Sequence, residues 1–413
     1  MTSEEINGPV AVERLAAALP PDVRLFHIGP AKTGTTSLQA AAAATRPEQL
    51  AHGVIYPGQA RSQRAAVAAF LGRSVQYNRA RDHEAEATPS LKPWDDMMAE
   101  VSASPHLRAW FGHEYAAGAA PSQVADFAAA IGPQLHVVVT LRSFTKMLPS
   151  IWQESNKAGN TGGFDGFVKR MLTVAPEERE RVPFHLRHDH GGLVRRWAGV
   201  VGLENVTVVV ADDHDHSFTV RAFEDLLGLP RGLMASAEIP PRASNRTMSV
   251  PEIEFVRQIN KELRERGLPW SDYERLMIKG GITRMLSRRK PRADEPRLKL
   301  SRWAAARAEE FQGRSVEAIL ASGVRVIGDP NRLLEPAVAR SSKQEAHISV
   351  EWVPLDAAVE AAVGIIAAAS GHSADFEKLP PAPMTLRRAL GAWARERTGR
   401  DVHSVRDLLR RRP

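Results

Sequence analysis

The chain has 413 residues and a formal net charge of +7, and its 43% hydrophobic and 25% charged residues are typical of a soluble globular protein with a large core. It contains no cysteine, which excludes disulfides, thiolate metal sites and a cysteine nucleophile. A basic balance spread over this length suits anionic ligands but does not by itself indicate nucleic acid.

The two ends of the chain lack the patterns of membrane targeting. Residues 1–22 carry Glu4, Glu5 and Glu13 without a basic stretch before an apolar core, unlike a secretory signal. The longest apolar run near the C-terminus, Ala361 to Ala369, is far shorter than the roughly 20 residues of a spanning helix. We therefore expect a cytoplasmic protein with an N-terminal extension over residues 1–22.

The first predicted strand runs from Val23 to Ile28, where apolar residues are dense enough for a strand covered on both faces. Gly29-Pro30 ends it, and a helix is predicted from about Thr36 to Ala44. The loop between them and the first helical turn contain one lysine followed by small and hydroxyl residues: Lys32, Thr33, Gly34, Thr35, Thr36 and Ser37. Free N–H groups at a helix N-terminus bind anions, so this junction is predicted to bind an anionic group.

The register of this loop differs from that of nucleotide hydrolases and kinases. Their Walker pattern, GxxxxGK[ST], places a lysine directly after the second glycine. Here Thr35 occupies that position, and Lys32 lies two residues before Gly34. The lysine would therefore reach a different oxygen of the bound group. The alternative is a plain strand-to-helix turn, which requires neither Lys32 nor the hydroxyls.

Further strands and helices alternate along the chain. Strands are predicted at residues 53–57, 107–112, 135–141, 205–211 and 324–327, and helices at residues 59–86, 94–102, 121–131, 193–201 and 251–266. This alternation predicts an α/β fold with a parallel sheet. Because such sheets bind ligands beyond the carboxyl ends of their strands, Gly29, His113, Arg142 and Asp212 are expected to face one crevice.

A second candidate anion site follows the strand at 135–141. Arg142 comes directly after it, and Ser150, eight residues later, lies about two turns further on if the segment is helical. A guanidinium and a hydroxyl together can bind a terminal phosphate, with the guanidinium offering a planar fork of donors. The alternative is that Arg142 pairs with a nearby carboxylate.

These two elements together resemble the nucleotide-binding elements of sulfotransferases that use 3′-phosphoadenosine-5′-phosphosulfate (PAPS). The string HIGPAKTGTTSLQ resembles the bacterial branch of that family, and the resemblance covers residues 23–229 and extends loosely to residue 334. It implies a three-layer, P-loop-like α/β fold with a central parallel sheet flanked by helices. It also implies that the Lys32 to Ser37 loop binds the 5′-phosphosulfate, and that Arg142 and Ser150 bind the 3′-phosphate.

The reaction implied by this resemblance is transfer of a sulfuryl group from PAPS to an acceptor hydroxyl. Negative charge develops on the bridging oxygen of the leaving phosphate, where Lys32 would stabilise or protonate it. No metal is expected, because a sulfuryl group carries less charge than a phosphoryl group. His113 or Glu114 is expected to act as general base; alternatively, both belong to an ordinary polar strand end. His27 is expected to be a core histidine.

Two clusters combine histidine and aspartate, which can bind metals. They are His185, His188, Asp189 and His190, and the run Asp212, Asp213, His214, Asp215 and His216. Consecutive residues rarely converge on one ion, so we predict no metal site. His188 or His190 remains a candidate for acceptor binding.

The predicted organisation is a sulfotransferase domain over residues 23–340 and a helical, Arg-rich C-terminal extension over residues 341–413. The domain includes a basic, lid-like loop at about 270–300, centred on residues 288–290. The expected acceptor is a hydroxyl of a carbohydrate, a glycolipid or a small natural product, without a specific nucleic-acid partner. Two alternatives remain: a P-loop kinase that uses ATP, and a non-catalytic protein that binds polyanions. The oligomeric state is not predicted.

Overall fold

The computed structural model of the chain describes residues 15–73, 90–238, 246–336, 338–340, 350 and 352–372. The chain divides into two compact units. The first unit comprises the residues up to Trp270 together with Lys290–Pro354, and the second comprises Ser271–Arg289 together with the residues from Leu355 onward.

The strands are β1 (Arg24–Gly29), β2 (Val54–Ile55), β3 (Arg108–Gly112), β4 (Leu135–Leu141), β5 (Val206–Val210) and β6 (Arg325–Ile327). The α-helices are α1 (Thr35–Ala44), α2 (Arg46–Ala51), α3 (Arg64–Phe70), α4 (Lys92–Ser102), α5 (Pro121–Ile131), α6 (Phe144–Lys157), α7 (Phe164–Leu172), α8 (Pro183–His188), α9 (His190–Val201), α10 (Phe218–Leu227), α11 (Val250–Glu265), α12 (Trp270–Tyr273), α13 (Thr283–Arg288), α14 (Arg302–Ser322) and α15 (Leu355–Ala369). Short 3₁₀ segments are η2 (Glu114–Gly118), η3 (Pro176–Arg181), η4 (Leu203–Asn205) and η6 (Pro330–Leu334), and η5 (Glu274–Ile282) is a π-helix.

The strands of the first unit form a parallel sheet in the order β2-β3-β1-β4-β5-β6. β1 pairs with β3 on one side and with β4 on the other. The chain leaves β1 toward β2 and leaves β4 toward β5, so the connections diverge between β1 and β4. In parallel α/β sheets, ligands bind in the crevice at such a divergence, beyond the carboxyl ends of the strands.

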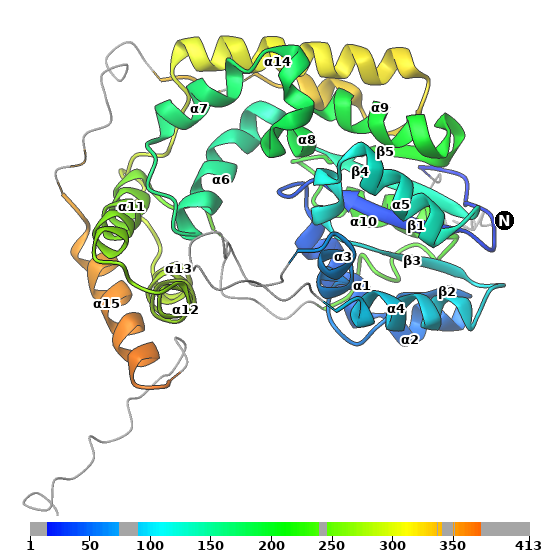
Figure 1. The fold of residues 1–413 in the computed structure, drawn as a ribbon, viewed down its shortest axis with the longest axis horizontal. Helices are drawn as coiled ribbons and strands as arrows, with labels where there is room; N and C mark the ends of the chain where they lie inside the picture. The colour runs from blue at the N-terminus through cyan, green and yellow to red at the C-terminus, as the bar shows by residue number, and fades with distance from the viewer. Residues whose placement is uncertain are drawn as a thin grey trace, which may run out of the picture. The chain divides into compact units, whose positions relative to one another are not determined.

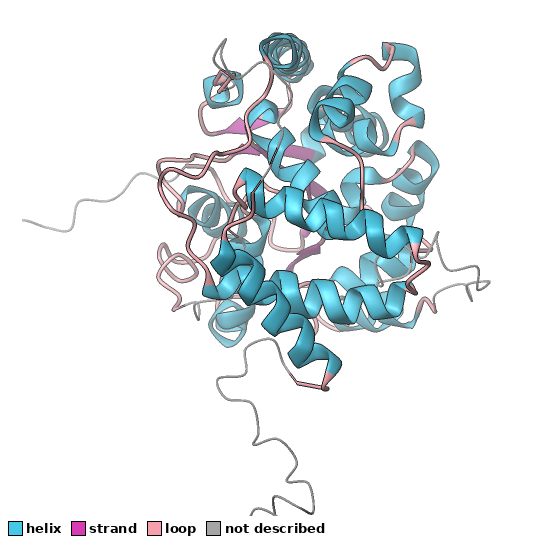
Figure 2. Ribbon diagram, turned by 90° about the vertical axis from the view of Figure 1, so that its left-hand side faces the viewer, coloured by secondary structure: helices cyan, strands magenta, loops and turns pink. Residues whose placement is uncertain are grey.

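Helices cover both faces of this sheet, because successive residues of each strand point to opposite sides. Phe26 and Ile28 of β1 pack in a core cluster with residues of α3, α4, α5 and α9. Leu25 packs on the other face with residues of α1 and α10. Figure 1 shows α5 and α9 close to β4 and β5, and Figure 2 shows strands lying among helices. The predicted three-layer α/β fold with a central parallel sheet is confirmed.

Two helices begin at prolines and differ from the predicted elements. The helix predicted from about Thr36 to Ala44 is confirmed as α1, but α2 follows it directly with Pro47 in its first turn. α4 begins at Lys92, two residues before the predicted start, with Pro93 in its first turn. A proline is tolerated there because the first N–H groups of a helix lack intrahelical partners. Of the helix predicted at residues 59–86, the structure contains α3, while residues 74–89 lie outside the described ranges.

The second unit contains the first part of the predicted basic loop. Residues 274–288 are helical, as η5 and α13, so the prediction of a loop at about 270–300 was wrong over these residues. These helices pack against α15 within the same unit. No helix within the described ranges is both long and apolar enough to cross a bilayer. The predicted C-terminal extension lies outside the described residues from position 373 onward.

Candidate functional site

The loop between β1 and α1 turns sharply through left-handed backbone. Lys32 has φ 73° and Gly34, the N-cap of α1, has φ 88°; the glycine adopts this conformation without the clash that a Cβ introduces. The buried Thr33 hydroxyl donates to the Pro30 carbonyl at 2.8 Å and lies 2.7 Å from Oγ1 of Thr140 on β4. Thr33 therefore fastens the loop to the sheet through its side chain, and only its backbone is free to face a ligand.

The first turn of α1 follows this loop. Thr36 and Ser37 are exposed there, whereas Thr35 is buried. The Ser37 N–H bonds back to the Gly34 carbonyl at 3.1 Å. The N–H groups of a first helical turn carry partial positive charge toward solvent. This turn therefore presents the donors that an anionic group requires.

Lys32 extends from the loop to α6. Its Nζ lies 2.9 Å from Oε1 of Glu154, and the same oxygen accepts from Lys157 Nζ at 2.8 Å. Ser150 lies four residues before Glu154, so the two share one face of the helix. Burial opposes ionisation of Glu154, but Lys157 and Lys32 outweigh it and lower the pKa of this carboxyl. The structure thus brings Lys32 to the helix face that carries the half-buried Ser150.

Arg142, at the end of β4, pairs with a carboxylate. Its Nε lies 2.7 Å from Oδ1 of Asp213, and Lys146 Nζ lies 2.9 Å from Oδ2 of the same residue. Burial opposes ionisation of Asp213, but its bonds to Lys146 and Arg142 lower its pKa. The alternative left open by the sequence, a local carboxylate partner for Arg142, is therefore observed. The pair involves Nε, and the guanidinium has two further nitrogen donors.

His113 and Glu114 follow β3 and lie at the start of η2. His113 caps η2 by accepting the Tyr115 N–H at its Nδ1, 3.3 Å away, and its Nε2 lies 3.3 Å from Oε2 of Glu114. Burial lowers the pKa of His113 to about 3, with a further contribution from Arg64. His113 is therefore neutral near pH 7, with its proton on Nε2, and its acceptor nitrogen is already used in the cap.

Glu114 lies against the beginning of the Lys32 loop. A Cβ built on Gly29 would be 2.8 Å from Cβ of Glu114, so only a glycine at this position leaves room for the carboxylate residue. The Glu114 side chain is 25% exposed. Burial raises its pKa above 4.5, and this effect exceeds the opposing influences of Arg64, Gln39 and Lys32. Glu114 is thus a partly buried carboxyl beside the loop lysine.

His27, on β1, is a core residue. It is 2% exposed and its Nε2 lies 3.1 Å from Thr140 Oγ1. Burial, with a smaller contribution from His113, lowers its pKa to about 3. The expectation of a core histidine is confirmed.

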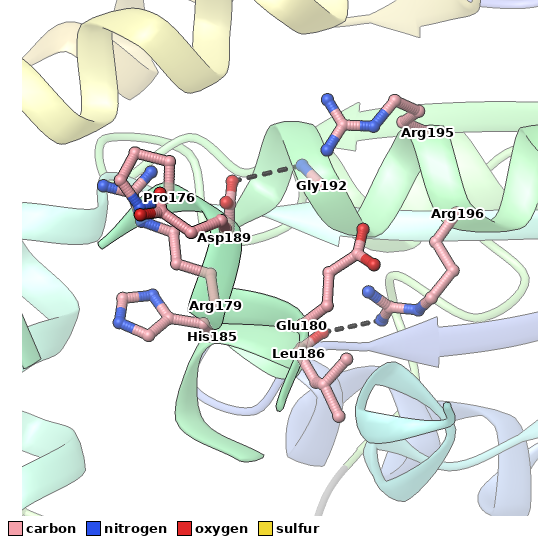
Figure 3. A pocket seen from close by; sticks show the side chains of 10 residues that line it. Pro176, Arg179, Glu180, His185, Leu186, Asp189, Gly192, Arg195 and Arg196 are labelled. Carbon is pink, nitrogen blue, oxygen red and sulfur yellow. Dashed lines mark hydrogen bonds between the residues drawn. The ribbon is translucent and has the colours of Figure 1, made fainter. Parts of the chain in front are cut away.

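The histidines of α8 and α9 are also buried, and His185 Nε2 bonds to the Met171 carbonyl at 2.9 Å. Asp189 caps α9 by accepting the Gly192 N–H at 3.1 Å. A cavity of about 210 Å³ lies beside these helices, and its lining includes His185 but not His188 or His190. Figure 3 shows His185 among the side chains that line it. Its lining mixes acidic and basic side chains: Glu177, Arg179, Glu180, Asp189, Arg195 and Arg196.

The acidic run after β5 does not converge on one point. Asp212 pairs with Arg332, Asp213 with Arg142 and Lys146, and Asp215 with Arg221. Within the described ranges, no three His, Cys, Asp or Glu side chains are grouped so as to hold a metal ion.

Sequence reasoning did not identify the partners of the two cationic residues. Glu154 had no assigned role, although, if the segment after Arg142 is helical, its position four residues after Ser150 places the two on the same face. Asp213 was considered only as a metal ligand. Thr140, which anchors both Thr33 and His27, appeared only as part of a strand. Contacts between residues so distant in sequence leave no local signal.

No protein-family model matches the chain, and no curated protein matches it. Among solved structures, it is similar to one described as a sulfotransferase from Alicyclobacillus acidocaldarius, with 16% identity over 61% of this chain and 94% of the other, at a TM-score of 0.32. At such an identity and TM-score, the similarity carries no argument about fold or activity.

Proposed function

We propose that the protein is a sulfotransferase that moves a sulfuryl group from PAPS to an acceptor hydroxyl. The observation that carries the proposal is the position of two cationic residues, each of which follows one of the two neighbouring strands at which the chain connections diverge. The Lys32 loop follows β1 and Arg142 follows β4, and β1 and β4 are neighbours in the sheet. A nucleotide bearing anionic groups at both its 5′ and 3′ positions fits two such elements, whereas ATP has no 3′-phosphate.

In this proposal, the first turn of α1 binds the 5′-phosphate through its N–H groups and the Thr36 and Ser37 hydroxyls. Lys32 leaves Glu154 and bonds to the oxygen that bridges phosphorus and sulfur. Arg142 and Ser150 bind the 3′-phosphate, with Arg142 using the nitrogens that Asp213 does not occupy. The bound phosphate groups thus take over part of the pairing that the Glu154 and Asp213 carboxylates provide for Lys32 and Arg142.

Glu114 is the proposed general base, since its carboxylate lies beside the loop and its pKa is raised by burial. It removes the proton of the acceptor hydroxyl while that oxygen attacks sulfur. The bond between sulfur and the bridging oxygen breaks, and adenosine 3′,5′-bisphosphate leaves with its charge stabilised by Lys32. The acceptor class proposed is a carbohydrate, a glycolipid or a small natural product.

Calorimetric titration with adenosine 3′,5′-bisphosphate and with ADP tests the donor. We expect the bisphosphate to bind at least about tenfold more tightly than ADP, a difference of about 1.4 kcal/mol. Arg142→Ala should weaken bisphosphate binding by about tenfold to a hundredfold, as expected for lost bonds to a charged group, and should leave ADP binding unchanged. Lys32→Ala should weaken both. Arg314→Ala, a surface arginine of α14 paired with Glu310, is the matched control.

Transfer itself is tested by mass spectrometry of hydroxylated compounds incubated with the protein and PAPS. A gain of one sulfuryl group that disappears in Lys32→Ala supports the proposal. Equal affinity for ADP and the bisphosphate, or magnesium-dependent turnover of ATP, would overturn it in favour of a kinase.

A further inference from the structure

A cluster of arginines lies beside Tyr115, the residue that follows the proposed base. Arg64 of α3 donates from Nε to the Tyr115 hydroxyl at 3.1 Å, and its guanidinium carbon is 5.6 Å from the centre of the ring. Arg187 of α8 packs on η2, since a Cβ built on Gly118 would be 2.7 Å from its Nε. Arg73, three residues after α3, interacts electrostatically with both Tyr115 and Arg187. We call Arg64, Arg73 and Arg187 the arginine cluster.

Two members of this cluster lack a counter-ion. Within the described ranges, the half-buried side chains of Arg73 and Arg187 form no ion pair, and Nε of Arg187 is buried without a hydrogen-bond partner. Burial lowers the pKa of both guanidinium groups, and the charge of Arg73 lowers the pKa of Arg187 further. A guanidinium stays protonated at neutral pH, and a charge withdrawn from water is costly unless it is paired. The cluster therefore favours an added anion.

The cluster borders the proposed catalytic base. The charge of Arg64 acts on the pKa of both Glu114 and His113, where it favours the ionised carboxylate and the neutral imidazole. The Tyr115 ring stands edge-on to the His113 ring, with their centres 4.4 Å apart. An acceptor whose hydroxyl lies at Glu114 is therefore close to the cluster.

The anionic groups of the proposed donor do not need this cluster. They are assigned to the first turn of α1 and to Arg142, which follow β1 and β4. The segment η2, on which the cluster packs, follows β3, and β3 pairs with β1 on the side away from β4. The sheet order thus separates the cluster from the proposed position of the 3′-phosphate.

We propose, on the basis of the function proposed above, that the acceptor carries an anionic group, a carboxylate or a sulfate, which Arg73 and Arg187 bind while its hydroxyl lies at Glu114. A guanidinium presents parallel N–H donors that match two oxygens of either group. The pairing also offsets the repulsion between the acceptor's charge and the Glu114 carboxylate. This narrows the acceptor to an acidic compound, for which an acidic carbohydrate is the simplest case.

Calorimetric titration with three related sugars tests this inference. The probes are methyl glucuronide, methyl glucoside sulfated on its primary hydroxyl, and neutral methyl glucoside. We expect at least one acidic sugar to bind about tenfold more tightly than the neutral one, as for bonds to a charged group. The more tightly bound of the two identifies the anionic group. Arg187→Gln should reduce the preference at least about fivefold, and Arg73→Gln should also reduce it. Both should leave the affinity for methyl glucoside unchanged.

Arg195→Gln is the matched control, because it removes the same charge from an exposed position on α9. It should leave the preference for the acidic sugars intact. Equal affinity for acidic and neutral sugars, or a preference that survives in both Arg187→Gln and Arg73→Gln, would overturn the inference.

The donor titration separates this inference from the proposed function. Arg187→Gln and Arg73→Gln should bind adenosine 3′,5′-bisphosphate as tightly as the unsubstituted protein, which also shows that they are folded. A preference for the bisphosphate over ADP without a preference for acidic sugars rejects the acidic acceptor alone. The opposite result rejects sulfuryl transfer from PAPS and leaves the cluster as an anion-binding site.

Discussion

Glu114 and His113 illustrate how two neighbouring candidates for one role are separated by local geometry. His113 accepts a backbone N–H at Nδ1, and its Nε2 faces the Glu114 carboxylate at 3.3 Å. A histidine in this state has no free lone pair with which to accept a proton. Glu114 keeps a carboxylate beside the loop. Under the proposed function, Glu114 is therefore the base and His113 is a positioning residue.

The variant Glu114→Gln should lower the rate of sulfuryl transfer by about 10²–10⁴-fold, the usual contribution of a general base. In the unsubstituted protein, the rate should fall as the pH falls, because the base must be ionised. The loss begins at a higher pH than for an ordinary carboxyl, since burial raises the pKa of Glu114 above 4.5. The pH dependence of kcat/KM measures this fall in rate on the acidic side of the profile. In Glu114→Gln, the acidic fall should vanish.

His113→Asn is the matched control for this prediction. Asparagine can cap η2 through its side-chain oxygen, as His113 does through Nδ1, but it removes the imidazole. We expect a modest loss of rate with the same acidic limb. If His113→Asn abolished transfer while Glu114→Gln retained it, the assignment of the base would be reversed.

At the scale of elements, α6 is the link between the two proposed anion sites. It begins two residues after Arg142, carries Ser150, and contacts the Lys32 loop through Glu154. Glu154 competes with a bound anion for Lys32 and also repels that anion. The ion pair is partly exposed, so its own contribution to stability is small.

Glu154→Gln should therefore tighten the binding of adenosine 3′,5′-bisphosphate by about twofold to fivefold, as expected for removing a partly exposed ion pair and a like charge. Calorimetric titration measures the change. Glu254→Gln on α11, where the carboxylate pairs with Arg257, makes the same change of charge elsewhere and should leave affinity unchanged. Weaker binding by Glu154→Gln would instead mean that Glu154 positions Lys32 for the ligand.

The elements themselves differed in how well the sequence predicted them. β1, β3, β4 and β5 were predicted because each is a short, dense apolar run, and their parallel pairing followed from the alternation with helices. Arg142 was correctly placed at the end of a strand, and Ser150 lies on a helix, the conformation that its predicted spacing from Arg142 assumed. The carboxylate partner of Arg142 is some 70 residues away along the chain, and no local pattern reports such a pairing.

The second unit was missed for a related reason. It joins residues 271–289 to α15, and these segments are separated in sequence by the whole of α14, β6 and η6. Gly280 and Gly281 fall within the lid-like loop predicted at about 270–300, a stretch rich in glycine, arginine and proline. Here Gly280 allows close contact with Gly364, a role that becomes visible only once the partner helix is known.

At the scale of the whole molecule, several histidines are folded into the interior in their neutral form. Burial is the main cause that lowers their pKa, to about 3 for His27 and His113 and to about 4 for His136 and His190. All four are at most 5% exposed. On unfolding, each regains an ordinary pKa near 6.5 and binds a proton at mildly acidic pH.

The free energy of unfolding should therefore decrease as the pH falls below about 6.5, because the unfolded state then binds more protons than the folded state. Each such histidine contributes about 1.4 kcal/mol per pH unit until the pH approaches its folded pKa. Urea unfolding at pH 7, 6 and 5 measures the slope. His136→Gln can keep the bond to Thr207, which is 2.8 Å long with histidine. It should reduce the slope of the unfolding free energy by the contribution of one histidine.

The carboxyls with lowered pKa, such as Glu154 and Asp213, contribute to the slope only below the ordinary carboxyl pKa near 4. A stability that stayed constant between pH 7 and 5 would mean that these histidines are protonated in the folded protein, and the packing around β1 and β4 described above would then be wrong.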